Sequence, residues 1–137
     1  MTQRACEARN IVLIVEDEPS SQFVLSEMCR AIGFDCETAS DGQQCLERIS
    51  ERPSDYSLIL MDVHMPKMSG LDTSLEIRNS DRNPPRDLPI IAITADTYWQ
   101  NPNRCKEFGI DTVVGKPVKM RTLTRVIQQH IRQIAAG

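Results

Sequence analysis

The chain has 137 residues, a formal charge of −3, and a composition that is 40% hydrophobic but only 4% aromatic. One domain of roughly 100–200 residues accounts for this length. No apolar run approaches the roughly 18 residues of a membrane-spanning helix, and the N-terminus lacks the apolar core of a secretory signal. The mild acidity argues against a dedicated nucleic-acid binder, because such proteins gain much of their affinity by neutralising phosphates. We therefore expect a cytoplasmic domain at residues 11–134, with an N-terminal extension at 1–10 and a C-terminal tail at 135–137.

The cysteine content favours reduced thiols over disulfides or zinc. The number of cysteines is odd, and no two are spaced as C-x-x-C. Without a secretory signal, we interpret them as small hydrophobic residues. Zinc remains an alternative, although the spacings match no zinc finger or ribbon. The possible ligands are Cys6, Cys29, Cys36, Cys45, Cys105, His64 and His130.

Five segments are predicted as strands. Four are short continuous apolar runs, which are typical of strands covered on both faces of a parallel sheet. They lie at residues 11–15, 57–61, 90–93 and 111–114. A weaker, alternating segment at 35–39 fits an edge strand.

Helical patterns lie between the predicted strands. Apolar residues recur every three or four positions at 20–32, 42–50, 70–80 and 119–134. In the first of these segments the apolar positions are Val24, Leu25, Met28, Cys29 and Ile32, followed by Gly33 at the expected helix end. Residues 97–108 form a poorer pattern, which Pro102 interrupts. The last predicted helix carries His130, which we expect to be exposed.

The predicted order, in which strands and helices alternate throughout, indicates an α/β domain. Such alternation implies a parallel sheet with helices on both faces and right-handed crossovers. Polar residues lie at the ends of the predicted strands. Glu16 and Asp17 follow the first strand along the chain, and Asp62 lies at the end of the third. Thr94 lies at the end of the fourth strand, and Lys116 follows the fifth. Because the carboxyl ends of parallel strands share one edge of the sheet, we expect these side chains to converge there.

The charges of these convergent residues are those expected of a site for a divalent cation and a phosphoryl group. Three carboxylates held together repel one another, and a divalent cation relieves that cost. Mg²⁺ prefers hard oxygen ligands and commonly takes one or two carboxylates together with phosphate. A lysine and a hydroxyl opposite the carboxylates complete a pocket for a phosphoryl group, with a carboxylate as its acceptor.

Four segments resemble the receiver domain of two-component response regulators, most closely the receivers of hybrid sensor kinases. They read VEDEP at 15–19, MDVHMPKMSG at 61–70, AITA at 92–95 and GKP at 115–117. The D-x-x-M-P-x-M-x-G pattern is the most specific of them. The resemblance extends over residues 11–134. It implies a flavodoxin-like (βα)5 fold, a doubly wound five-stranded sheet with strand order 2-1-3-4-5 in a three-layer sandwich.

The resemblance also implies a role for each site residue. Asp62 would accept a phosphoryl group from the phosphohistidine of a histidine kinase or histidine phosphotransfer protein. Glu16, Asp17, Asp62 and the backbone carbonyl of His64 would hold Mg²⁺, or alternatively Mn²⁺. Thr94 and Lys116 would contact the phosphoryl group, and Pro117 would follow a cis peptide bond.

Other positions are expected to tune the switch. Val113 replaces the aromatic residue that often precedes the lysine in this family, so we expect coupling through the loop after Thr94 instead. His64 and Asp96 are candidates for tuning dephosphorylation. The last predicted helix is basic and offers a possible docking surface.

Four hypotheses of function remain open. The leading one is a phosphorylation-dependent switch, not a metabolic enzyme, either monomeric or dimeric upon phosphorylation. It would act through a downstream effector on the face formed by the fourth and fifth strands and the helices after them. The second hypothesis is a phosphatase with an aspartate nucleophile. It is weakened because His64 stands where the D-x-D motif of such enzymes has its second carboxylate. An interaction module that works without phosphorylation is the third hypothesis, and a flavin-binding protein is the fourth. We expect no output domain within the chain.

Overall fold

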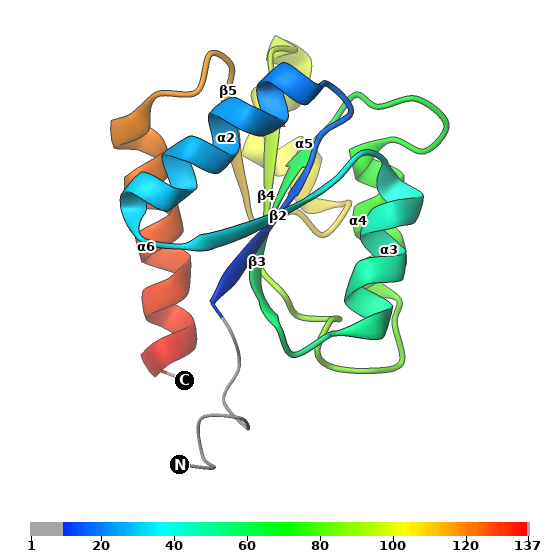
Figure 1. Cartoon of the computed structure of the whole chain (residues 1–137). Coiled ribbons are helices and arrows are strands. Elements are labelled where there is room, and N and C mark those ends of the chain that lie inside the picture. Colours follow the sequence, from blue (N-terminus) through cyan, green and yellow to red (C-terminus); the bar gives the residue numbers. More distant parts are fainter. Residues whose placement is uncertain (1–9, 137) are drawn as a thin grey trace, which may run out of the picture.

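A computed structural model of the protein describes residues 10–136, with side chains as far as residue 131. Strands and helices alternate along the chain around a central sheet (Figure 1). The strands are β1 (Ile11–Val15), β2 (Asp35–Ala39), β3 (Tyr56–Asp62), β4 (Ile90–Thr94) and β5 (Thr112–Gly115). The helices are α2 (Pro19–Ile32), α3 (Gly42–Glu51), α4 (Gly70–Arg78), the short 3₁₀ helix η1 (Thr97–Gln100), α5 (Pro102–Lys106) and α6 (Met120–Ala136).

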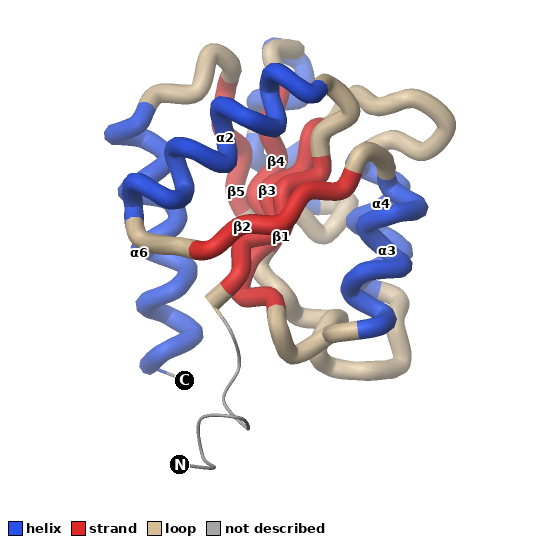
Figure 2. Tube along the Cα trace, in the orientation of Figure 1, coloured by secondary structure: helices blue, strands red, loops and turns tan. Residues whose placement is uncertain are grey.

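The sheet is fully parallel and has the order β2-β1-β3-β4-β5, which confirms the predicted topology. Helices α2 and α6 lie on one side of it, and α3 and α4 lie on the other (Figure 2). The chain runs from β1 out to the edge strand β2 and then back past β1 to β3. This reversal of strand order places the carboxyl ends of β1 and β3 side by side, where ligands bind in open α/β sheets.

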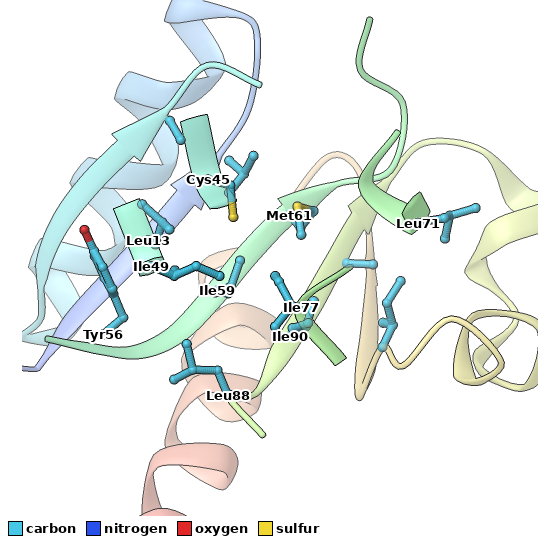
Figure 3. Close-up of a cluster of buried hydrophobic side chains, with 14 of the residues drawn as sticks. Leu13, Cys45, Ile49, Tyr56, Ile59, Met61, Leu71, Ile77, Leu88 and Ile90 are labelled. Carbon is cyan, nitrogen blue, oxygen red and sulfur yellow. The ribbon is translucent and has the colours of Figure 1, made fainter. Parts of the chain in front are cut away.

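Two hydrophobic cores hold the three layers together, one on each face of the sheet. Successive side chains of a strand point to opposite faces. Leu13 and Ile59 therefore pack in the core beneath α3 and α4 (Figure 3), whereas Ile14 and Leu60 pack beneath α2 and α6. This double burial explains why the central strands are continuously apolar.

The segment between β4 and β5 differs from the prediction. The sequence pattern predicts one irregular helix at 97–108, with Pro102 as an interruption. Instead, η1 ends at Gln100 and Pro102 occupies the first turn of α5. Asn101 caps that helix by accepting the backbone N–H of Asn103 at 2.9 Å. Proline has no backbone N–H, but an N–H in the first turn of a helix has no partner within the helix in any case. Pro102 can therefore begin this helix without losing a hydrogen bond.

The last helix also departs from the prediction. It runs to Ala136, so two residues of the expected tail at 135–137 are helical. The prediction that His130 is exposed is wrong. The residue is half-buried, and its Nε2 forms a 2.8 Å hydrogen bond with the Thr112 hydroxyl. Three and four positions separate it from the buried Ile127 and Val126, so it shares their face of the helix.

Two further observations complete the fold. Cys29, Cys36, Cys45 and Cys105 are free thiols, and Cys6 lies outside the described residues. Within residues 10–136, no helix is long and apolar enough to cross a lipid bilayer.

Candidate functional site

The acid pair lies at the end of β1 and is held in place by backbone contacts. The Glu16 N–H donates to the Ala39 carbonyl at 3.0 Å, which continues the pairing between β1 and β2. The Gln22 side chain of α2 donates to the Glu16 carbonyl at 2.6 Å. The Glu16 side chain is only 2% exposed, whereas the Asp17 side chain faces solvent.

Asp62 ends β3 next to the acid pair. Its carboxylate is buried, and its Oδ1 accepts the His64 N–H at 3.2 Å. The following loop returns tightly, and the Gly70 N–H donates to the Val63 carbonyl at 2.9 Å. A Cβ at position 70 would clash with the Asp62 carbonyl oxygen, so this close approach requires the glycine of the motif.

Three carboxylates come together, as predicted. One oxygen each from Glu16, Asp17 and Asp62 lies within 4.8 Å of the others. Within the described part of the chain, no other group of three histidine, cysteine or acidic residues is arranged to share a metal ion, and no cysteine joins this one. The zinc alternative thus finds no support among these residues. Carboxylate oxygens at this spacing fit the ligand preference of Mg²⁺.

Lys116 reaches the carboxylates from the loop after β5. Its Nζ lies 3.4 Å from Glu16 Oε1 and 3.6 Å from Asp62 Oδ2. Partial burial disfavours the charged ammonium, but the Asp62 and Glu16 carboxylates outweigh that effect and raise the Lys116 pKa. The lysine is therefore held as a cation beside the Asp62 and Glu16 carboxylates.

Glu16 carries the clearest electrostatic signature of the site. Burial, and then repulsion from the Asp62 carboxylate, raise the pKa of Glu16 from 4.5 to about 7. The Glu18 N–H and Lys116 oppose this shift without cancelling it. A cation bound beside this buried carboxylate would favour its ionised form and relieve the repulsion among the three acids.

The carboxylates line an open pocket of about 520 Å³. Its lining residues are Glu16, Asp17, Glu18, Asp62, His64, Ala95, Asp96 and Lys116. Across its mouth, His64 Nε2 lies 3.1 Å from Asp96 Oδ2. The sequence identified both residues separately, but their contact was not predicted, because they lie far apart in the chain.

Thr94 lies beside this pocket rather than in its lining. The residue is buried at the end of β4, and its hydroxyl accepts the Asp96 N–H at 3.0 Å. That hydroxyl thus ties Thr94 to the loop carrying Asp96. Val113 is half-buried and packs against the core beneath α3 and α4. The Lys116–Pro117 peptide bond is cis, as the resemblance implies.

A second, mostly apolar groove of about 290 Å³ adjoins the site. Glu16 and Lys116 line both cavities. The groove is otherwise lined by Ser20, Ser21, Val24, Leu25, Ile93, Pro117 and Val118. Val24 is 54% exposed and its neighbour Phe23 is 65% exposed, although Val24 belongs to the apolar pattern predicted for α2. The spacing identified the apolar stripe of α2 but not the part of it that stays uncovered.

Comparison with known proteins agrees with this geometry. The sequence pattern of the response regulator receiver domain matches residues 12–128. The chain belongs to the response regulator receiver family. Over 123 residues it is 35% identical to hybrid signal transduction histidine kinase I of Dictyostelium discoideum. The matched segment covers 88% of this chain but only 7% of that kinase.

Solved structures give the same result. The receiver domain of sensor histidine kinase PA1611 from Pseudomonas aeruginosa, solved with a magnesium ion coordinated in its active-site cleft, is 35% identical. It matches with a TM-score of 0.76 over 90% of this receiver and 98% of that chain. Chemotaxis protein CheY4 of Vibrio cholerae is 27% identical and matches with a TM-score of 0.77. The match covers 89% of this chain and 98% of the CheY4 chain. Receiver domains are signalling domains rather than metabolic enzymes, and those of hybrid kinases interact with histidine kinases or phosphotransfer proteins.

Proposed function

We propose that this receiver is a phosphoacceptor that takes a phosphoryl group onto Asp62 from a phosphohistidine in a Mg²⁺-dependent step. The observation that carries the proposal is the setting of the Asp62 carboxylate. Its Oδ2 lies 3.6 Å from the Lys116 ammonium, and a carboxyl oxygen of the residue lies within 4.8 Å of oxygens from both Glu16 and Asp17. A nucleophile between a cation and a metal-ligand set suits transfer of a highly charged group.

The bond changes follow from the chemistry of the two partners. A carboxylate oxygen of Asp62 attacks phosphorus, and the phosphorus–nitrogen bond of the donor breaks. The donor imidazole departs with the electrons of that bond, and the product is an aspartyl phosphate. Lys116 would pair with a phosphoryl oxygen, exchanging one of its present carboxylate partners for the new anion.

Glu16, Asp17 and Asp62 would hold the metal, with the backbone carbonyl of His64 as a further oxygen ligand. Bound Mg²⁺ supplies positive charge that offsets the repulsion among the carboxylates and the incoming phosphoryl oxygens. Ionisation of Glu16 is part of this proposal, because the protonated carboxyl is a poor ligand for a hard cation.

Loss of the phosphoryl group resets the switch. We assign its tuning to His64 and Asp96, whose side chains meet at the pocket at 3.1 Å and would there limit the approach of water to an aspartyl phosphate. Thr94 connects the site to the same loop, because its hydroxyl accepts the Asp96 N–H. Reorientation of Thr94 toward an aspartyl phosphate would change that contact and carry the signal to an effector on the face formed by β4, α5, β5 and α6.

The apolar groove beside the pocket is the surface on which we place the phosphohistidine-bearing partner. Glu16 and Lys116 belong to the walls of both cavities, so one partner surface can cover the groove while its phosphohistidine reaches Asp62. Val24 lines this groove and its chain neighbour Phe23 is also exposed. Covering exposed apolar area in an interface is favourable, because it removes that area from water.

A paired experiment separates docking from chemistry. Val24→Asp, or Phe23→Ser, is expected to slow phosphotransfer from a phosphorylated histidine phosphotransfer protein at least tenfold. Phosphorylation by acetyl phosphate, which needs no protein interface, should stay unchanged. Equal loss with both donors would show that these substitutions damage the site instead of the docking surface.

The function itself is tested by transfer from phosphorylated histidine kinases to the intact chain, followed by intact-protein mass spectrometry. Asp62→Asn, which keeps the shape of the side chain, should receive no phosphoryl group. If no donor, including acetyl phosphate, phosphorylates the native chain, and Mg²⁺-dependent beryllofluoride binding is also absent, an interaction module that works without phosphorylation replaces this proposal.

A further inference from the structure

One side chain of the short helix η1 reaches back to the ends of two strands at the site. Gln100 is half-buried, and its Nε2 donates to the Thr94 carbonyl at 3.0 Å. The same carbonyl accepts the Lys116 backbone N–H at 2.9 Å. Thr94 ends β4 and is paired with Gly115, which ends β5. Gln100 therefore contacts the backbone where the residues that carry the hydroxyl and the ammonium group of the site are joined.

The end of β5 leaves room for this side chain. A Cβ at position 115 would lie 3.0 Å from Gln100 Nε2 and 3.2 Å from its Cδ, closer than ordinary van der Waals contact. The glycine thus permits the close approach of the carboxamide. Because a carbonyl oxygen only accepts hydrogen bonds, the NH₂ group of Gln100 is the part of the side chain that can bind Thr94. The contact depends on both the length and the donor of the glutamine.

Thr94 is connected to η1 by a second route, through its hydroxyl. That hydroxyl accepts the Asp96 N–H at 3.0 Å. The Asp96 carboxylate accepts the Tyr98 N–H at 2.9 Å, and the Asp96 carbonyl accepts the Trp99 N–H at 3.0 Å. An aspartyl phosphate that draws the Thr94 hydroxyl away would break this route. The Gln100 route would persist, because it uses the Thr94 carbonyl.

We propose that Gln100 is a positioning residue that couples Thr94 to η1 and so carries the phosphorylation signal out of the site. The coupling rests on the proposed function, because it begins with the reorientation of Thr94 upon phosphorylation of Asp62. Movement at the end of β4 shifts the carbonyl that Gln100 holds, and η1 moves with it. Val113 has no polar group with which to follow Thr94, and it packs against the core beneath α3 and α4.

The helix η1 carries a side chain suited to contact a partner at the surface. Tyr98 is 53% exposed, and the Arg104 guanidinium carbon lies 4.1 Å from the centre of its ring. The Tyr98 ring also packs edge to face against Trp99, whose carbonyl accepts the Cys105 thiol at 3.1 Å. Tyrosine and arginine are enriched among the residues that dominate protein interfaces. Movement of η1 would therefore alter an exposed tyrosine–arginine pair shared with α5.

Trp99 makes the coupling measurable, because it is the only tryptophan in the chain and directly precedes Gln100. Its ring packs edge to face against Tyr98 and Phe108, with centroid distances of 4.9 and 5.7 Å, so its emission should respond to a movement of η1. The probe is beryllofluoride with Mg²⁺, a stable mimic of the aspartyl phosphate. We expect the native chain to change its Trp99 emission upon beryllofluoride binding, relative to Mg²⁺ alone, with binding itself measured by calorimetric titration.

Gln100→Met tests the contact, because methionine has a similar shape but no N–H donor. The variant should bind beryllofluoride as tightly as the native chain or more tightly, since binding no longer has to move η1. It should lose at least half of the emission change. Gln43→Met makes the same chemical change at an exposed position on α3 and should behave as the native chain does.

Gly115→Ala perturbs the same contact independently, and it provides the test if Gln100→Met does not fold. The added Cβ would displace the Gln100 carboxamide, so this variant should also lose at least half of the emission change. Combining the two substitutions should reduce the emission change no further than either does alone.

Several outcomes would overturn the coupling. A full emission change in either variant would show that the signal bypasses Gln100. Parallel loss of beryllofluoride binding and of the emission change would show that Gln100 only supports the site. Normal binding without any emission change in the native chain would refute the coupling alone. Absence of Mg²⁺-dependent beryllofluoride binding to the native chain would refute the proposed function together with the coupling.

Discussion

Replacing Glu16 by glutamine removes one buried negative charge while keeping the shape of the side chain. The native carboxyl is 2% exposed, and its Oε2 accepts the Glu18 N–H at 3.2 Å, a contact that a glutamine oxygen reproduces. The substitution therefore isolates the cost of ionising this group. We expect Glu16→Gln to stabilise the metal-free receiver and to weaken its response to Mg²⁺.

The size of the stabilisation expected for Glu16→Gln, and its dependence on pH, follow from the raised pKa of Glu16. The Glu16 pKa is about 7 in the folded chain, against an ordinary value of 4.5. An acid whose folded pKa is raised loses stability as the pH increases from its unfolded pKa through its folded pKa. At about 1.4 kcal/mol per unit, ionised Glu16 lowers the free energy of unfolding by roughly 3 kcal/mol at pH 8 and by about 1 kcal/mol or less at pH 5.

Urea unfolding at pH 5 and pH 8, with EDTA and with MgCl₂, measures both effects. In EDTA the advantage of Glu16→Gln should grow from pH 5 to pH 8. In saturating Mg²⁺ the native chain should gain stability through ligand binding, and the variant should gain less. Glu47→Gln, at an exposed position on α3, is the control and should behave as the native chain does. A variant that is less stable than the native chain in EDTA at pH 8 would refute this reasoning.

Four further outcomes are expected. Lys116→Ala should bind Mg²⁺ more tightly, because a competing cation is gone, but accept phosphate more slowly; calorimetric titration and acetyl phosphate labelling measure these two effects. Replacing both His64 and Asp96 by alanine should cost about 0.5–2 kcal/mol, because Asp96 also caps η1 by accepting the Tyr98 N–H at 2.9 Å, and it should shorten the phosphoryl lifetime. An unchanged lifetime would remove the two residues from the tuning role. Gly70→Ala should cost about 1–3 kcal/mol through overpacking against the Asp62 carbonyl, measured by urea unfolding. Ile59→Ala in the fully buried core should cost about 2–5 kcal/mol in the same assay, and a cost near zero would contradict its packing.

The central strands and the site residues are predictable from the sequence because local pattern and topology agree there. Residues such as Leu13 and Ile14 are both fully buried, on opposite faces of the sheet, so a continuous apolar run indicates a parallel strand. Once the sheet is parallel, the residues after its strands share an edge. That argument alone brings Asp62 and Lys116 together, although they are distant in the chain.

Other features depend on which helices and strands pack against one another, and the spacing of apolar residues in the sequence does not determine that packing. Val24 belongs to an apolar stripe yet stays exposed, because the elements packed on α2 leave part of that stripe uncovered. Pro102 either breaks or starts a helix, and the cap supplied by Asn101 decides the outcome. For His130 the signal was available in its spacing from Val126, but its partner Thr112 belongs to a different element.

The central claim is that Asp62 accepts the phosphoryl group with the help of a divalent cation. Borohydride reduces an acyl phosphate to an alcohol, so an aspartyl phosphate becomes homoserine and can be located by peptide mass spectrometry. After exposure to a phosphorylated donor in MgCl₂, the native chain should carry homoserine at position 62 alone, and a sample in EDTA should carry none. Homoserine at any other aspartate, or equal labelling of position 62 in EDTA, would contradict the account.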